Sequence, residues 1–277
     1  MGQVLFVVWR EAVEALLVIG ILYAWLTTLP EGKTGKRFLL LGVVIGLVLA
    51  AFLAASIYGL SSILEGETYD LFMIGMQLFA AVLIVQMVYW MSQHGRHLKQ
   101  HLEQGLSTHV ANANWLGVTL ITAIAIAREG SEIVVFLSST IFALTSETLW
   151  PFIGQCALGL VLAFLTFYCF QATKRFMSWQ LFFKITTIVL LFLGASLFLK
   201  GMEGVLDYGE SNLDWELAEW LLDPVWNISD WLNDSSSTGS LLASLFAYRS
   251  QPTWYSLICF GAYWLVIWFL FKVVKRK

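Results

Sequence analysis

Long apolar stretches constrain this chain more than any other feature. A helix that crosses a bilayer needs about 20 mainly apolar residues, and seven stretches meet this condition. They are residues 2–29, 38–62, 69–92, 116–144, 150–172, 181–201 and 253–274. The stretches lack strand-like alternation and are too long for barrel strands. The sequence therefore predicts an all-α membrane protein with seven transmembrane helices.

Composition excludes the other common classes of protein. Of the 277 residues, 58% are apolar and 13% are charged, whereas a soluble domain is about 45–50% apolar and about 25% charged. A disordered chain is excluded for the same reason, and a net charge of −3 gives no support to nucleic-acid binding. The cysteines Cys156, Cys169 and Cys259 are scattered singly, so we interpret them as small core residues without a disulfide. The first stretch is too long for a signal peptide, and we interpret it as the first span.

Lysine and arginine set the predicted orientation. Eleven of them fall in the first, third and fifth connectors and in the C-terminal tail, whereas the even-numbered connectors hold Lys200 and Arg249. The eleven are Lys33, Lys36, Arg37, Arg96, Lys99, Lys174, Arg175, Lys272, Lys275, Arg276 and Lys277. Since cytoplasmic loops carry the excess of positive charge, we expect the N-terminus outside and the C-terminus in the cytoplasm.

Six charged residues lie well inside the predicted spans, away from their ends, and form a repeated R-E-x-x-E motif. The first copy holds Arg10, Glu11 and Glu14, and the second holds Arg128, Glu129 and Glu132, at an offset of 118 residues. Each charge at the centre of a span costs roughly 2.5–3.5 kcal/mol on the insertion scale. Ionisable residues at this depth therefore indicate a functional site, although ion pairs that only fix helix packing are the alternative.

The spacing of the motifs has geometric consequences. Residues three apart share a helix face, and an arginine can pair with the glutamate four residues later. The two motifs lie in spans of opposite direction, which predicts a 3+3 inverted repeat with a seventh helix appended. If the motifs meet at mid-depth, four carboxylates converge into a site for a hard cation.

This plan divides the chain into five segments. Residues 1–92 and 116–201 form the two three-helix repeats, joined by a cytoplasmic connector at 93–115. Residues 202–252 form an acidic, Trp-rich outer loop, and 253–277 form the seventh helix and a basic cytoplasmic tail. In the outer loop we expect short helices at the membrane interface, carrying Trp215, Trp220, Trp226 and Trp231.

Acidic residues concentrate on the predicted outer face. A negative potential there would attract cations, and a solvated loop is the alternative. The residues expected to form an outer cation funnel are Glu65, Glu67, Asp70, Asp207 and Glu210.

Histidines at helical spacing lie in the predicted cytoplasmic connector. His94, His97 and His101 could receive metal that leaves the membrane, or form the solvated face of a short helix.

Several uncharged residues are candidates for supporting the site. Gln77 and Gln86 could hydrogen-bond the motif carboxylates or bridge helices. Ser131 could offer its hydroxyl oxygen or bond back to its own helix. Close helix packing is expected at Gly42, Gly46, Gly154 and Gly159.

At the two R-E-x-x-E motifs the sequence resembles the oxidase-dependent iron permeases, a family with yeast and bacterial members. The resemblance implies high-affinity iron uptake across the inner (plasma) membrane of a bacterium, with Fe3+ as the substrate after oxidation by a partner on the outer face. It implies that Glu11, Glu14, Glu129 and Glu132 bind the ion, that Arg10 and Arg128 are required, and that the protein is a transporter with no prosthetic group. Ala12 departs from the glycine usual in the family, which is present as Gly130.

Other functions remain open on the residues alone. Carboxylates would equally suit a transporter of Mn2+ or Mg2+. A membrane-embedded di-iron oxidase usually carries Glu-x-x-His on its helices, and no histidine lies in a predicted span. A metal-sensing receptor that does not transport is a third alternative.

Overall fold

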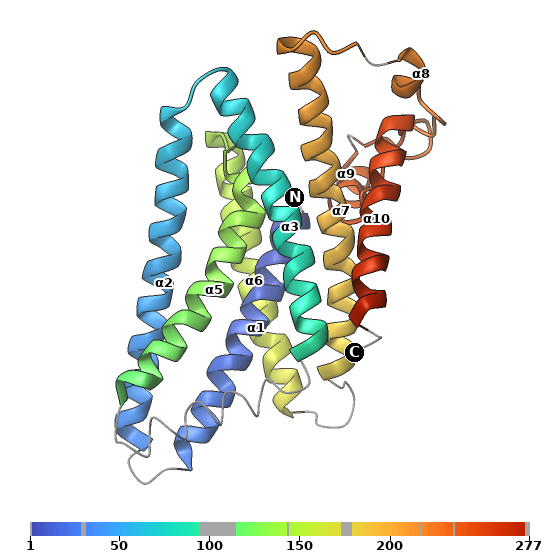
Figure 1. The fold of residues 1–277 in the computed structure, drawn as a ribbon. Helices are drawn as coiled ribbons and strands as arrows, with labels where there is room; N and C mark the ends of the chain where they lie inside the picture. Colours follow the sequence, from blue (N-terminus) through green and yellow to red (C-terminus); the bar gives the residue numbers. More distant parts are fainter. Residues whose placement is uncertain are drawn as a thin grey trace. The chain divides into compact units, whose positions relative to one another are not determined.

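The computed structural model describes residues 2–28, 32–94, 115–142, 144–172, 179–216, 218–234 and 236–274. Seven long helices lie in this part of the chain (Figure 1). They are α1 (Gly2–Thr27), α2 (Gly32–Ile63), α3 (Glu67–His94), α5 (Trp115–Phe142), α6 (Ser146–Ala172), α7 (Trp179–Asn212) and α10 (Trp254–Val274). Two short helices, α8 (Glu219–Leu222) and α9 (Ser237–Phe246), lie between α7 and α10. The all-α prediction is confirmed over these residues.

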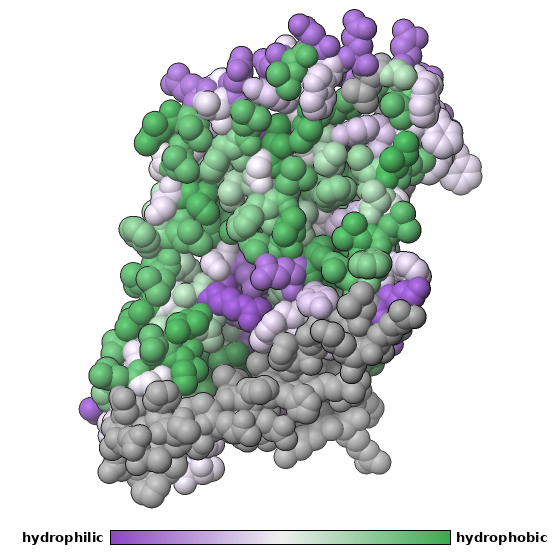
Figure 2. Space-filling model, viewed as in Figure 1, coloured by the Kyte–Doolittle hydropathy of each residue, from purple (hydrophilic) through white to green (hydrophobic). Residues whose placement is uncertain are grey.

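Among the described residues, five helices are long and apolar enough to cross a membrane: α2, α3, α6, α7 and α10. Their apolar side chains cover much of the surface in Figure 2, and hydrophilic residues gather at the end where α3 begins and α7 ends. The remaining long helices, α1 and α5, have 26 and 28 residues. At about 1.5 Å per residue each exceeds the roughly 30 Å hydrocarbon core. Each of the two carries the three charged residues of an R-E-x-x-E motif, and this separates them from the other five.

The helices fall into two compact units. The first unit comprises residues 1–3, 61–93 and 178–277, and so contains α3 and α7 to α10. The second comprises residues 4–60 and 94–177, and contains α1, α2, α5 and α6. Both R-E-x-x-E motifs belong to the second unit.

Glycines bring the helices of the second unit into close contact. A Cβ on Gly42 of α2 would lie 2.6 Å from the carbonyl oxygen of Thr119 in α5, and Gly46 makes a similar approach. A Cβ on Gly159 of α6 would lie 3.1 Å from a backbone oxygen of α1. These three glycines confirm the expected close packing, whereas Gly154 faces open space. In this unit α2 therefore packs on α5, and α6 packs on α1.

An apolar cluster joins α1, α2 and α5 on the C-terminal side of the first motif. It is built from Val18, Leu22, Leu26, Leu39 and Val118, all of them buried. The three residues from α1 repeat every four positions, so they form one stripe along the helix. This stripe fixes which face of α1 is directed at α5. The two helices run in opposite directions (Figure 1).

In the first unit, α7 packs between α3 and α10. A Cβ on Gly201 would lie 2.6 Å from Leu78 of α3, and one on Gly204 would lie 2.8 Å from Ile74. On the α10 side, the Tyr263 hydroxyl donates to the Leu191 carbonyl oxygen at 2.8 Å.

The helix of the predicted sixth span extends beyond residue 201. The helix continues to Asn212, because Gly201 and Gly204 hold it against α3 and Leu206 is buried. The predicted outer loop at 202–252 therefore begins with eleven residues of helix.

Of the four tryptophans expected on short helices, one lies in a helix, and the interfacial position stays a prediction. Trp220 lies in the four-residue α8, whereas Trp215, Trp226 and Trp231 lie outside helices. All four side chains are exposed. The longer helix of this segment is α9, which carries no tryptophan.

Candidate functional site

The first motif is organised around a buried arginine on α1. Arg10 is 0% exposed, as is Glu11. The Arg10 Nη1 atom lies 2.5 Å from Glu11 Oε1, and Nη2 lies 2.5 Å from Glu14 Oε1. Because residues four apart are neighbours on a helix, the pairing with Glu14 follows from the spacing. The guanidinium thus fixes the orientation of both carboxylates.

The second motif, on α5, has a more open arginine. The Arg128 Nε atom lies 3.1 Å from Glu132 Oε1, and the Arg128 side chain is 39% exposed. Glu129 is buried, with 7% of its surface exposed. Gly130, which lies between the two glutamates of this motif, faces α2, and a Cβ on it would lie 2.5 Å from the Ala50 side chain.

The two helices bring their carboxylates together. One oxygen each from Glu11, Glu14 and Glu129 lies within 4.8 Å of the others, a spacing that could hold a metal ion. Glu132 lies within electrostatic range of all three. The four glutamates and two arginines together carry a formal charge of −2.

Several carboxylate oxygens in this cluster are buried without a hydrogen bond from the described residues. They are Glu11 Oε2, Glu129 Oε2 and Glu132 Oε2. A buried carboxylate is costly unless it is paired or coordinates a metal. Oxygen donors of this kind suit hard cations. The cluster, which we call the glutamate cluster (Glu11, Glu14, Glu129 and Glu132), thus has the donor set of a cation site.

The hydroxyl groups beside the cluster bond within their own helix. Ser131 donates to the Arg128 carbonyl oxygen at 2.7 Å, the alternative noted for this residue.

Gln77 and Gln86 lie on α3, in the first unit. Their expected contact with the motif glutamates stays a prediction.

The acidic residues of the expected funnel are all exposed and belong to the first unit. They are Glu65, Glu67, Asp70, Asp207 and Glu210, at the start of α3 and along the end of α7. Their role in gathering cations stays a prediction.

The side chains of the three histidines expected at the cytoplasmic exit lie outside the part of the chain that the structure describes. His94 is the last residue of α3, and its side chain, together with His97 and His101, lies outside the described residues. Cys156, Cys169 and Cys259 are free thiols.

One supporting contact escaped the sequence analysis. Trp9, next to Arg10, donates from Nε1 to the Thr166 hydroxyl of α6 at 3.0 Å. Thr166 also donates to the Leu162 carbonyl oxygen. The sequence signal that could have indicated this contact is Thr166 itself, a hydroxyl residue within the apolar run of α6. The contact ties the turn of α1 that carries the motif to α6.

Comparison with known proteins agrees with the expected family. The profile of the Iron permease FTR1 family matches residues 1–275. The ferrous iron permease EfeU of Escherichia coli O6:H1 is 28% identical over 255 residues, which cover 89% of this chain and 86% of the relative. EfeU of Yersinia pestis is 25% identical over 273 residues, which cover 98% and 93%. No solved structure matches the chain. The chain belongs to the iron permease FTR1 family.

Proposed function

We propose that this protein takes up iron across the bacterial inner membrane through the glutamate cluster. The observation that carries the proposal is the convergence of buried carboxylates from α1 and α5, of which three lie within 4.8 Å of one another. Oxygen ligands at about 2.0–2.2 Å from an ion lie at most about 4.4 Å apart. Small side-chain movements would therefore bring the three glutamates onto one ion.

The proposed architecture has seven spans, arranged as a 3+3 inverted repeat with α10 appended. The packing of the second unit supports this arrangement, because the second helix of each predicted repeat packs on the motif helix of the other. Gly42 brings α2 to α5, and Gly159 brings α6 to α1. These glycines are 117 residues apart, close to the offset of 118 between the motifs. Inverted repeats with the substrate site at their interface are a recurring plan in transporters.

In the proposed pathway, cations gather at the acidic outer face and exchange water for the glutamate oxygens. Arg10 holds Glu11 and Glu14 in place and reduces the negative charge that must be buried. The ion then leaves toward the cytoplasm. The membrane potential contributes about 2.3 kcal/mol per charge per 100 mV, which drives entry without a coupling ion.

The proposed substrate is Fe3+, produced by a partner oxidase on the outer face. Donors that are all carboxylate oxygens favour hard ions, and the resemblance implies the ferric ion. The curated relatives are named as ferrous iron permeases, which makes Fe2+ the alternative. A formal charge of −2 would be neutralised by Fe2+, whereas Fe3+ would leave the cluster with +1.

Uptake of radioactive iron into proteoliposomes that hold this chain alone tests the proposal. Iron is offered as Fe3+ citrate and, in a parallel series with ascorbate, as Fe2+, under an inside-negative potential. We expect uptake above that of protein-free vesicles in one valence state, with weak competition by Mn2+ and Mg2+. Uptake in neither state contradicts a permease. Stronger transport of Mn2+ or Mg2+ than of iron favours the alternative substrate. Oxygen consumption with Fe2+ but no uptake favours a di-iron oxidase.

A further inference from the structure

The segment between α7 and α10 turns back along α7, so that α9 lies beside an earlier part of that helix. We propose that α9 is a re-entrant helix, inserted beside α7 into the hydrocarbon layer and held there by an ion pair between Glu203 and Arg249. In this arrangement the described residues between α7 and α10 form a strap that the ion pair fixes to α7, where the sequence predicts an outer loop with short interfacial helices. The proposal concerns the first unit alone and does not depend on the transported ion.

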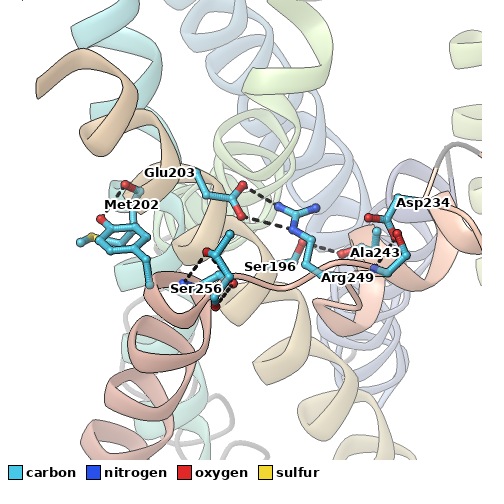
Figure 3. A network of polar contacts seen from close by, with 10 residues as sticks. Ser196, Met202, Glu203, Asp234, Ala243, Arg249 and Ser256 are labelled. Carbon is cyan, nitrogen blue, oxygen red and sulfur yellow. Dashed lines mark hydrogen bonds and ion pairs between the residues drawn. The ribbon is translucent and has the colours of Figure 1, made fainter. Parts of the chain in front are cut away.

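The depth of α9 follows from its contacts along α7. The start of α10 lies level with Met202, because the Tyr255 hydroxyl donates to the Met202 carbonyl oxygen at 2.8 Å. α9 contacts earlier positions on α7. Ser196 donates to the Ala243 carbonyl oxygen at 2.8 Å (Figure 3), and the rings of Phe192 and Phe246 are 5.8 Å apart. At about 1.5 Å per residue, α9 lies about 9–15 Å deeper than the start of α10.

The composition and packing of α9 suit this depth. The helix has ten residues, and none of them is charged. Such a helix is too short to cross a bilayer, so it must return to the side from which it enters. Ala243 and Ser244 are buried. The Leu241 side chain occupies the space beside Gly2 in which a Cβ would lie.

Backbone N–H groups at both ends of α9 have hydrogen-bond partners within the chain. At its start, the Ser236 side chain accepts a hydrogen bond from the Gly239 N–H at 3.0 Å. At its end, Ala247 adopts a left-handed conformation and its N–H bonds to the Leu242 carbonyl oxygen. Beyond it, the Ser250 N–H donates to Asp234 Oδ1 at 2.9 Å. Irregular backbone is tolerated at membrane depth only when it is buried and hydrogen-bonded in this way.

The ion pair joins the exit of α9 to α7. Arg249 donates from Nε to Glu203 Oε1 at 3.2 Å and from Nη2 to Oε2 at 2.7 Å. The two parallel bonds form the bidentate geometry that fixes an arginine most specifically. Figure 3 shows the pair between α7 and the chain that leaves α9. Since Arg249 lies three residues after α9, breaking this pair frees one side of the strap.

Thiol labelling in intact cells tests both parts of the proposal. Cys156, Cys169 and Cys259 are first replaced by alanine, and Ser244→Cys is then labelled with a membrane-impermeant maleimide. We expect labelling at least about tenfold slower than at Ser211→Cys, an exposed position on α7, because the reagent must await a local opening. Adding Arg249→Ala should speed labelling of Ser244→Cys severalfold. Exchanging the charges, with Glu203→Arg and Arg249→Glu, should restore protection.

A depth measurement separates insertion from burial in a domain outside the membrane. A spin label at Leu242→Cys, which is partly exposed on α9, should collide more with oxygen than with a water-soluble nickel complex. A label at Val266→Cys on α10 provides the lipid-exposed reference. Water-like accessibility at residue 242, or rapid labelling of Ser244→Cys, overturns the re-entrant helix. Unchanged labelling of Ser244→Cys in the Arg249→Ala and Arg249→Lys variants would show that the ion pair does not hold α9 in place. Glu219→Gln on α8 is the matched control variant.

Discussion

Gly130 of α5 faces Ala50 of α2 so closely that a Cβ on residue 130 would lie 2.5 Å from the Ala50 side chain. The equivalent position of the first motif is Ala12, which is buried at 9% exposure. A methyl group is thus accommodated in one motif but not in the other. The departure from the family pattern at residue 12 removes no ligand, and the glycine that packing requires is present at residue 130.

The first prediction concerns this contact. Gly130→Ala should destabilise the protein by about 1–3 kcal/mol through overpacking, offset in part by the roughly 1 kcal/mol gain in helix propensity. Adding Ala50→Gly should relieve the clash. Thermal unfolding of the purified protein in detergent measures both effects. Gly154→Ala on α6, where the space is open, should be neutral or stabilising, and equal losses at the two sites would contradict this account.

The second prediction concerns Arg10. Arg10→Gln leaves Glu11 and Glu14 buried without their cation, which should cost about 3–5 kcal/mol. Arg249→Gln breaks a partly exposed pair and should cost about 1 kcal/mol or less. Denaturant unfolding of the two variants compares them directly. Adding Glu11→Gln to Arg10→Gln should recover part of the lost stability but none of the iron uptake. Similar losses for the two arginine variants would show that the buried pairs of α1 contribute little.

The third prediction concerns the ligands. Glu14→Gln and Glu132→Gln should each reduce iron uptake by about 100-fold or more, since even partners of metal ligands contribute 10–100-fold. The protein should still insert into the membrane, because an amide is cheaper to bury than a carboxylate. Proteoliposome uptake is measured beside Glu147→Gln, an exposed position at the start of α6. Normal transport by either cluster variant rules out a site that uses all four carboxylates.

The fourth prediction distinguishes seven spans from five. If α1 and α5 cross the membrane, cysteines placed before and after each of them lie on opposite sides. In an otherwise cysteine-free chain, Ser146→Cys should react with an impermeant reagent from outside, and Lys99→Cys should react only after the membrane is opened. For α1, a cysteine in a tag added before Met1 and Lys33→Cys should differ in the same way. Equal reactivity within either pair would show that the helix between them does not cross.

The sequence predicts the long helices well because their apolar runs are continuous. It also predicts that Glu11, Glu14 and Glu129 share a region, since the motif repeats at helical spacing on helices of opposite direction. The difference between Arg10 and Arg128 could not be foreseen. It depends on which neighbours cover each guanidinium, and the two motifs are alike in sequence.

Two elements of the first unit escape sequence reasoning for physical reasons. The end of α7 is polar, and contacts of Gly201 and Gly204 with α3 stabilise it, which no hydropathy pattern records. α9 is too short to register as a span, and its position depends on Ser196 and Phe192, more than forty residues earlier in the chain. Sequence patterns report local periodicity, whereas both features depend on distant partners.

The crosswise packing of the second unit has a consequence for how the protein can be divided. Because α2 covers α5 and α6 covers α1, neither residues 2–94 nor residues 115–274 can bury their own motif helix completely. Two such fragments made as separate chains would each be an incomplete protein with half of the ligands. The two fragments would need to associate, with α2 packed on α5 and α6 packed on α1, before an ion could be bound.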